Sequence, residues 1–160
     1  MSRKGLRLWW RTGVLALLVV GLGVFALVRV LDDPAPDRAA VLLAGRGSAD
    51  AFFSLDYRRV EKNVDRVVTG STGRFRKEYA SRRDQIVADV KKQQLVIDVT
   101  VPPDGVALEF LTERRAQVLV SVDLARTTAG TKAGTERFRA RISLRKVGDR
   151  WLASDVRQVP

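Results

Sequence analysis

Residues 137–145 read RFRARISLR, with apolar residues at even positions and polar residues at odd positions. Successive side chains of a β-strand point to opposite faces, so this alternation predicts a strand with one buried and one exposed face. Gly148 and Asp149 follow as a tight turn into a second strand over residues 151–159. The stretch therefore predicts a β-hairpin near the end of the chain.

Two further strands are expected before this hairpin. Residues 95–101 are apolar and β-branched, and they stop at Pro102-Pro103-Asp104-Gly105, a sequence with strong turn chemistry. Residues 118–125 again alternate with a period of two. Residues 106–115 are ambiguous, part strand and part excursion, and residues 127–134 are expected to form a Gly/Thr loop.

Three helices are expected before the strands. Asp37 and Asp56 are candidate caps for the first two, because each precedes apolar residues at helical spacing. A break at residues 70–73 separates the third helix, which runs from Phe75 to Val90 with one apolar side. Helices followed by hairpin-linked strands predict an α+β domain over residues 38–160, with about three helices on one face of a mainly antiparallel four-stranded sheet.

The N-terminal region predicts a membrane anchor. Residues 12–31 are apolar except for Thr12 and Arg29, and a helix of that length spans about 30 Å, the thickness of a bilayer core. The preceding residues 1–11 are basic and residues 32–37 form a short linker rich in Asp and Pro. Because basic residues precede the apolar stretch and acidic residues follow it, the N-terminus is expected in the cytoplasm and the domain outside the cell membrane. A cleaved signal peptide is the alternative, although no small-x-small cleavage site follows.

Composition and charge exclude several classes of function. The chain has no His and no Cys, so zinc, iron–sulfur, haem, thiol and Ser-His-Asp chemistry lack their usual residues, and no cofactor or metal is expected. The net charge of +11 suggests nucleic acid, but five basic residues and no acid lie in residues 1–31. A moderately basic domain tethered outside the membrane is not expected to bind nucleic acid.

Acid–base chemistry has four candidates, Tyr57, Tyr79, Asp98 and Asp123. The tyrosines are expected to be core rings with their hydroxyls at the rim, and alternation places the two aspartates toward solvent. No convergent acid–base pair is visible, which predicts a protein that is not an enzyme. Together with Trp151, the tyrosines are candidate lining residues of a cavity; closing the core and binding an aromatic or sterol-like ligand are the two interpretations of Trp151.

Three arginines of the predicted strand at residues 137–145 share one strand face: Arg137, Arg139 and Arg141. A solvated face is one interpretation. The other is a docking face for an acidic partner or anionic headgroups, with Arg126 and Arg145 at its margin.

Four motifs carry a resemblance to a known family. They are Asp56-Tyr57-Arg58, the segment TGRFR at residues 72–76 leading to Tyr79, KQQ at residues 92–94, and KVGDRWLASD at residues 146–155. In this order the chain resembles the actinobacterial Mce-associated membrane proteins. The resemblance implies a cone-shaped fold like that of nuclear transport factor 2, in which a bent sheet wraps around helices.

The resemblance also implies a function. The chain would be an accessory subunit that helps to assemble or stabilise an Mce-type lipid or sterol import complex, with Mce subunits or a permease as partners. Two alternatives stay open: a secretion or conjugation scaffold of the VirB8 type, and a carrier or small enzyme that uses the cone cavity for a lipid or steroid.

Overall fold

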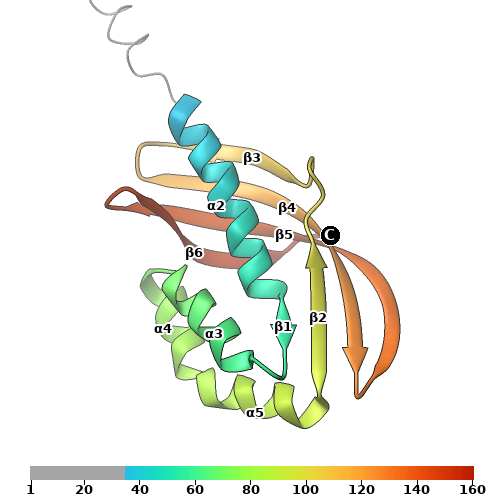
Figure 1. The fold of residues 1–160 in the computed structure, drawn as a ribbon. Coiled ribbons are helices and arrows are strands. Elements are labelled where there is room, and N and C mark those ends of the chain that lie inside the picture. Colours follow the sequence, from blue (N-terminus) through green and yellow to red (C-terminus); the bar gives the residue numbers. More distant parts are fainter. Residues whose placement is uncertain (1–34) are drawn as a thin grey trace, which may run out of the picture. The chain divides into compact units, whose positions relative to one another are not determined.

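The computed structural model describes residues 35–160, which form four helices and one sheet of six strands (Figure 1). The helices are α2 (Ala35–Phe53), α3 (Val60–Thr69), α4 (Gly73–Ser81) and α5 (Arg83–Gln93). The strands are β1 (Leu55–Asp56), β2 (Leu95–Thr100), β3 (Val106–Leu111), β4 (Arg115–Thr128), β5 (Thr131–Val147) and β6 (Arg150–Gln158). The predicted α+β class is confirmed, with four helices and six strands where three and four were expected.

No helix within residues 35–160 is both long and apolar enough to cross a bilayer. The predicted anchor at residues 12–31 and the basic tail at residues 1–11 lie outside the described residues. The linker predicted at residues 32–37 falls partly in α2, which begins at Ala35. The sequence predicts Asp37 as the cap of this helix. In the structure Asp37 lies in the first turn instead.

The long hairpin of β4 and β5 is the centre of the sheet. Its buried face follows the predicted alternation, and the residues of this face without exposed surface are Val118, Val120, Val122, Ala140 and Ile142. The Gly/Thr loop expected at residues 127–134 is wrong, because both strands continue through it and turn only at Ala129 and Gly130. Both turn residues have positive φ (48° and 82°), and the β-branched threonines around them favour extended backbone.

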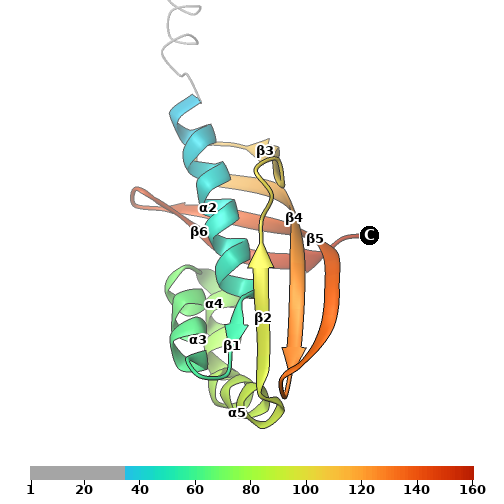
Figure 2. The same cartoon turned by 45° about the vertical axis from the view of Figure 1, so that its right-hand side comes forward.

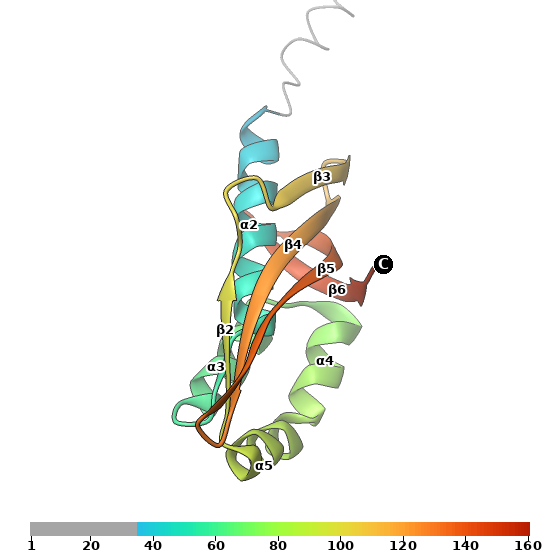
Figure 3. The ribbon, with the colours of Figure 1, turned by 90° about the vertical axis from the view of Figure 1, so that its right-hand side faces the viewer.

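Strands β2 and β3 lie end to end along the same edge of β4. Val106 to Leu111 pairs with the first half of β4, and Leu95 to Thr100 pairs with the second half. Gly105 makes the corner, since its carbonyl accepts a hydrogen bond from the Ser121 amide at 2.8 Å. Figure 2 shows β2, β4 and β5 running side by side below that corner, and Figure 3 shows how β4 and β5 bend along their length.

Helix α2 covers the buried face of the sheet (Figure 1). Val41 and Ala49 have no exposed surface and belong to the main core with Val118 and Ile142. Gly45 permits the close approach: a Cβ at this position would lie 2.7 Å from Cγ2 of Val118. Arg46 ties the same helix to the β2–β3 corner, because its guanidinium donates to the carbonyls of Val101, Pro102 and Pro103 at 2.6, 2.7 and 2.9 Å.

The remaining helices form a second, smaller core around Val60, Val64 and Val90. The expected single third helix is broken at Arg82, where φ is −97° and ψ is 5°, into α4 and α5. The expected Asp56 cap is also wrong: Asp56 lies in β1, and its carboxylate accepts the Arg58 amide at 3.0 Å before α3 begins. Asp56 pairs with Val96 of β2, although the local sequence predicts it at the start of a helix.

Candidate functional site

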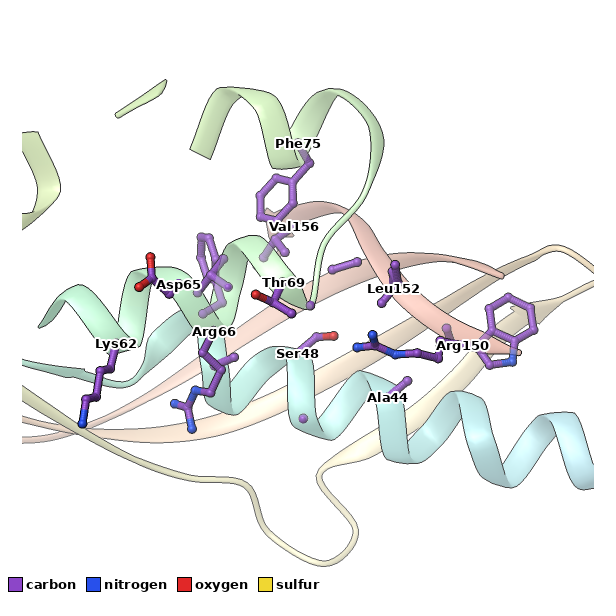
Figure 4. A pocket seen from close by; sticks show the side chains of 17 residues that line it. Ala44, Ser48, Lys62, Asp65, Arg66, Thr69, Phe75, Arg150, Leu152 and Val156 are labelled. Carbon is purple, nitrogen blue, oxygen red and sulfur yellow. The ribbon is translucent and has the colours of Figure 1, made fainter. Parts of the chain in front are cut away.

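The main cleft of residues 35–160 lies between α2, α3, the start of α4 and β6, with a volume of about 580 Å³. Its walls are largely small or apolar. Among the lining residues are Ala44 and Ala51 from α2, Val67 from α3, Phe75 from α4, and Ala153 and Val156 from β6. Figure 4 shows Lys62, Asp65 and Arg66 at one end of the cleft and Arg150 toward the other.

The local sequence explains how these elements meet. The segment between α3 and α4 runs beside β6, because the Thr72 amide donates to the Ala153 carbonyl at 2.8 Å and the Ala153 amide donates to the Gly70 carbonyl at 2.9 Å. Ser71 is buried between them and its hydroxyl donates to the Val68 carbonyl at 3.1 Å. Residues 70–73, which sequence marks as a helix break, thereby close one side of the cleft.

Of the three rings predicted to line a cavity, Trp151 lies in this cleft. Only 7% of the residue is exposed, and it belongs to the main core. Tyr57 and Tyr79 instead pack against the second core. The Tyr79 ring packs at a tilt against Phe52 and Phe75, with ring centroids 5.9 and 6.1 Å away, and so lies behind these two residues of the cleft wall.

Two of the charged residues at the rim of the cleft are paired within the chain. Asp65 at its rim accepts hydrogen bonds from Arg83 at 3.0 and 3.1 Å, and Arg66 contacts Asp50 at 3.1 Å. Behind the cleft wall, burial raises the pKa of the Tyr79 hydroxyl above its ordinary value. The cleft has an apolar floor between charged ends, and this arrangement suits an acyl chain or the side chains of a docked protein segment.

The other acid–base candidates lie on the sheet. Asp98 is exposed on β2. Asp123 on β4 accepts two hydrogen bonds from the Arg137 guanidinium at 2.8 and 3.0 Å, which lower the pKa of its carboxyl. Asp123 is thus the partner of one of the predicted docking arginines.

The predicted docking arginines lie on the outer face of β5, away from the main core. Arg141 is paired as well, because its guanidinium donates to both Glu109 carboxylate oxygens at 2.7 and 2.9 Å. Arg139 lies between these pairs, opposite Ser121 on β4. The charge of this face is therefore partly neutralised by carboxylates from β3 and β4.

Sequence reasoning missed several residues of these surfaces. The rim residues Lys62, Asp65 and Arg66 are not among the residues that the sequence singles out. Arg115 begins β4 opposite Arg145, and extending the period-two pattern of residues 118–125 back by three positions would have found it.

A model of the family described as "Uncharacterized protein Rv1363c/MT1408-like" matches residues 16–160. The uncharacterized protein Rv1363c of Mycobacterium tuberculosis is 30% identical over 125 residues, which are 77% of this chain and 47% of that protein. The chain thus spans about half the length of the curated relative it matches. These descriptions name no Mce system.

Solved structures share the fold. The periplasmic domain of DotI aligns with a TM-score of 0.62 and 14% identity over 76% of this chain and 94% of its own. An IcmL-like type IV secretion system protein from Legionella pneumophila aligns with a TM-score of 0.61 and 11% identity, over 78% of this chain and 94% of its own. CagV of Helicobacter pylori, a VirB8 homologue, aligns with a TM-score of 0.54 and 7% identity, over 76% of this chain and 97% of its own. At these identities the likeness establishes a VirB8-like fold.

Proposed function

This chain belongs to the Rv1363c/MT1408-like family of uncharacterized proteins, and from that premise we propose that it is a membrane-anchored, non-enzymatic scaffold subunit that assembles or stabilises a complex in the cell envelope. The observation that carries the proposal is the fold, which is shared over about three quarters of the chain with domains described as periplasmic or as parts of type IV secretion systems. In this proposal the segment at residues 12–31 is the anchor and residues 38–160 lie outside the cell membrane.

The finer proposal names an Mce-type lipid or sterol import complex as the assembly. The motifs at residues 56–58, 72–76, 92–94 and 146–155 support it through their resemblance to Mce-associated membrane proteins. A secretion or conjugation scaffold of the VirB8 type is the alternative within the same class. The two share an anchor-plus-domain layout, and the identity of the bound subunits separates them.

The geometry of the described residues supports a rigid binding surface. The Arg137–Asp123 and Arg141–Glu109 pairs crosslink the outer face of β3, β4 and β5. Helix α2 is held by Asp37 in its first turn and by Arg46 near its middle. A surface that is ordered before binding loses little conformational entropy when a partner docks.

Affinity purification of the tagged full chain from solubilised membranes of its native host tests the scaffold. We expect stoichiometric membrane subunits, with Mce proteins or their permease among them. A matched sample that carries only residues 1–37 and the tag controls for capture by the anchor. Recovery of the same subunits with that control would contradict a scaffold role for the domain.

A ligand carrier is the second candidate, favoured by the apolar floor of the main cleft. A carrier would retain one lipid or steroid in each chain through purification. Replacement of Ala51 on the cleft wall by Trp would then displace the ligand, while the Leu43→Trp change on the exposed side of α2 would not.

A further inference from the structure

The outer face of the sheet contains arginines of two kinds. Arg137 and Arg141 each make a bidentate pair with a carboxylate of a neighbouring strand. Within residues 35–160, Arg115 and Arg145 have no carboxylate within 4.0 Å of their guanidinium groups. Arg139 is unpaired by the same criterion but stands alone between the two bidentate pairs, whereas Arg115 and Arg145 bring two unpaired charges together further along the hairpin.

Arg115 and Arg145 are direct cross-strand partners in the β4–β5 ladder. Side chains in such positions start from Cβ atoms about 5 Å apart, and like charges there destabilise the pair. An anion between the two guanidinium groups removes this repulsion, and a carboxylate fits the planar fork of an arginine with two hydrogen bonds.

A hollow of about 510 Å³ lies beside this arginine pair. A row of cross-strand partners lines it and crosses four strands in register, from Phe110 on β3 through Gln117 and Ser143 to Asp155 on β6. Gln117 donates to the Ser143 hydroxyl at 3.4 Å. We call this surface the arginine hollow and define it by Arg115, Arg145 and these four residues.

Phe110 gives the arginine hollow an apolar contact, since half of its surface is exposed. An exposed aromatic ring beside unpaired arginines is a combination that protein interfaces use as an anchor. Asp155 in the same hollow contacts Arg157 at 2.6 Å. The charge of Asp155 is therefore matched within the chain, and the hollow is a local depression that a peptide segment can enter more easily than the flat surface of a bilayer.

We infer that the arginine hollow binds an acidic segment of a partner protein, with carboxylates on Arg115 and Arg145 and an apolar side chain on Phe110. The inference rests on the proposed scaffold function and names the chemistry of the partner. It also moves the docking surface from the predicted Arg137, Arg139 and Arg141 to the next part of the same face.

The test uses the full chain in detergent micelles and a fluorescein-labelled peptide of sequence SEDLDE, with SKKLKK as the control peptide. Fluorescence polarisation gives the dissociation constants. We expect the double change Arg115→Glu and Arg145→Glu to weaken binding of the acidic peptide by about tenfold or more, because two charge-assisted hydrogen-bonding sites are reversed. The neutral double change to Gln should weaken it less and keeps the test usable if the Glu variant fails to fold.

Arg139→Glu is the matched control. It makes the same kind of charge change on the same exposed face, six residues from Arg145 and therefore about 20 Å along β5. It should change the dissociation constant by less than about twofold. Far-UV circular dichroism and melting curves check that each variant is folded.

Three results would overturn the inference. They are equal binding of the two peptides, equal weakening by Arg139→Glu, and arginine-dependent binding to phosphatidylglycerol vesicles without binding to the acidic peptide. If any of them occurs while the full chain still co-purifies with envelope subunits, the proposed function stands and only the assignment of the arginine hollow falls.

Discussion

The Lys146 ammonium lies 2.8 Å from the Asp37 carboxylate and joins the first turn of α2 to the end of β5 across 109 positions of sequence. The same ammonium lies 5.7 Å from the centre of the Trp151 ring. One lysine thus connects the start of the described helix, the central hairpin and the indole that lines the main cleft. The hydrogen bond from Lys146 lowers the pKa of the Asp37 carboxyl below its ordinary value.

This pair predicts a dependence of stability on pH. Because the pKa of Asp37 is lower in the folded chain than in the unfolded chain, the pair stabilises the fold above the unfolded value and loses its effect as pH falls through the folded value. Lys146→Met should lower the melting temperature at neutral pH, and the difference from wild type should shrink in acid. Asp37→Asn and the double variant complete the cycle; an unchanged difference at all pH values would contradict the pairing.

The close contact of α2 with β4 predicts opposite effects for two glycines of one helix. Gly45→Ala places a Cβ 2.7 Å from the rigid, fully buried Val118, and overpacking of this kind costs about 1–3 kcal/mol, more than the helix-propensity gain of about 1 kcal/mol. Gly47→Ala meets no atom within 4 Å and should stabilise the domain. Urea unfolding of the two variants measures both signs, and a stabilising Gly45→Ala would be incompatible with this packing.

The clamp formed by Arg46 predicts a large effect from a partly buried side chain. Arg46→Met removes the donor for the carbonyls of Val101, Pro102 and Pro103, and we expect a loss of about 2 kcal/mol in the free energy of unfolding. Arg46→Lys should recover part of it, since an ammonium lacks the fork of a guanidinium. Arg38→Met, an exposed change on the same helix, is the control and should have little effect. Equal losses for positions 38 and 46 would contradict the clamp.

The two bidentate pairs of the outer face predict a second acid effect. Hydrogen bonds from Arg141 and Arg137 lower the pKa values of Glu109 and Asp123, so both carboxylates stabilise the fold at neutral pH and cease to do so as pH falls through their folded values. The double change Glu109→Gln and Asp123→Asn should flatten the acid side of a plot of melting temperature against pH. A slope identical to that of wild type would show that the pairs do not form in solution.

The sequence predicted the parts of the fold that local periodicity determines. The β5 alternation, the corner at residues 102–105 and the hairpin at Gly148 all follow from side-chain period or turn chemistry. Asp56 was assigned to a helix cap because nothing local indicates its pairing with Val96, 40 positions away. The break at Arg82 has no Gly or Pro to mark it, and the two helices on either side of it both contribute to the second core, α4 through Tyr79 and α5 through Ile86.

The candidate sites were less accessible from sequence. Alternation placed Arg137, Arg139 and Arg141 on one face, but the carboxylates that pair with two of them lie 14 and 32 positions away. Ring type alone could not separate Trp151, which lines the main cleft, from Tyr57 and Tyr79, which pack in the second core. Both distinctions depend on strand register and helix packing, which are properties of the folded chain.

Native mass spectrometry of the full chain, purified in mild detergent from its host membrane, tests the scaffold proposal most directly. The proposal predicts a complex whose mass includes at least one further membrane subunit in fixed ratio, with no small molecule on the domain after the subunits dissociate. Detection of the chain as a monomer with one lipid or steroid bound to it would contradict the scaffold function and establish a carrier function.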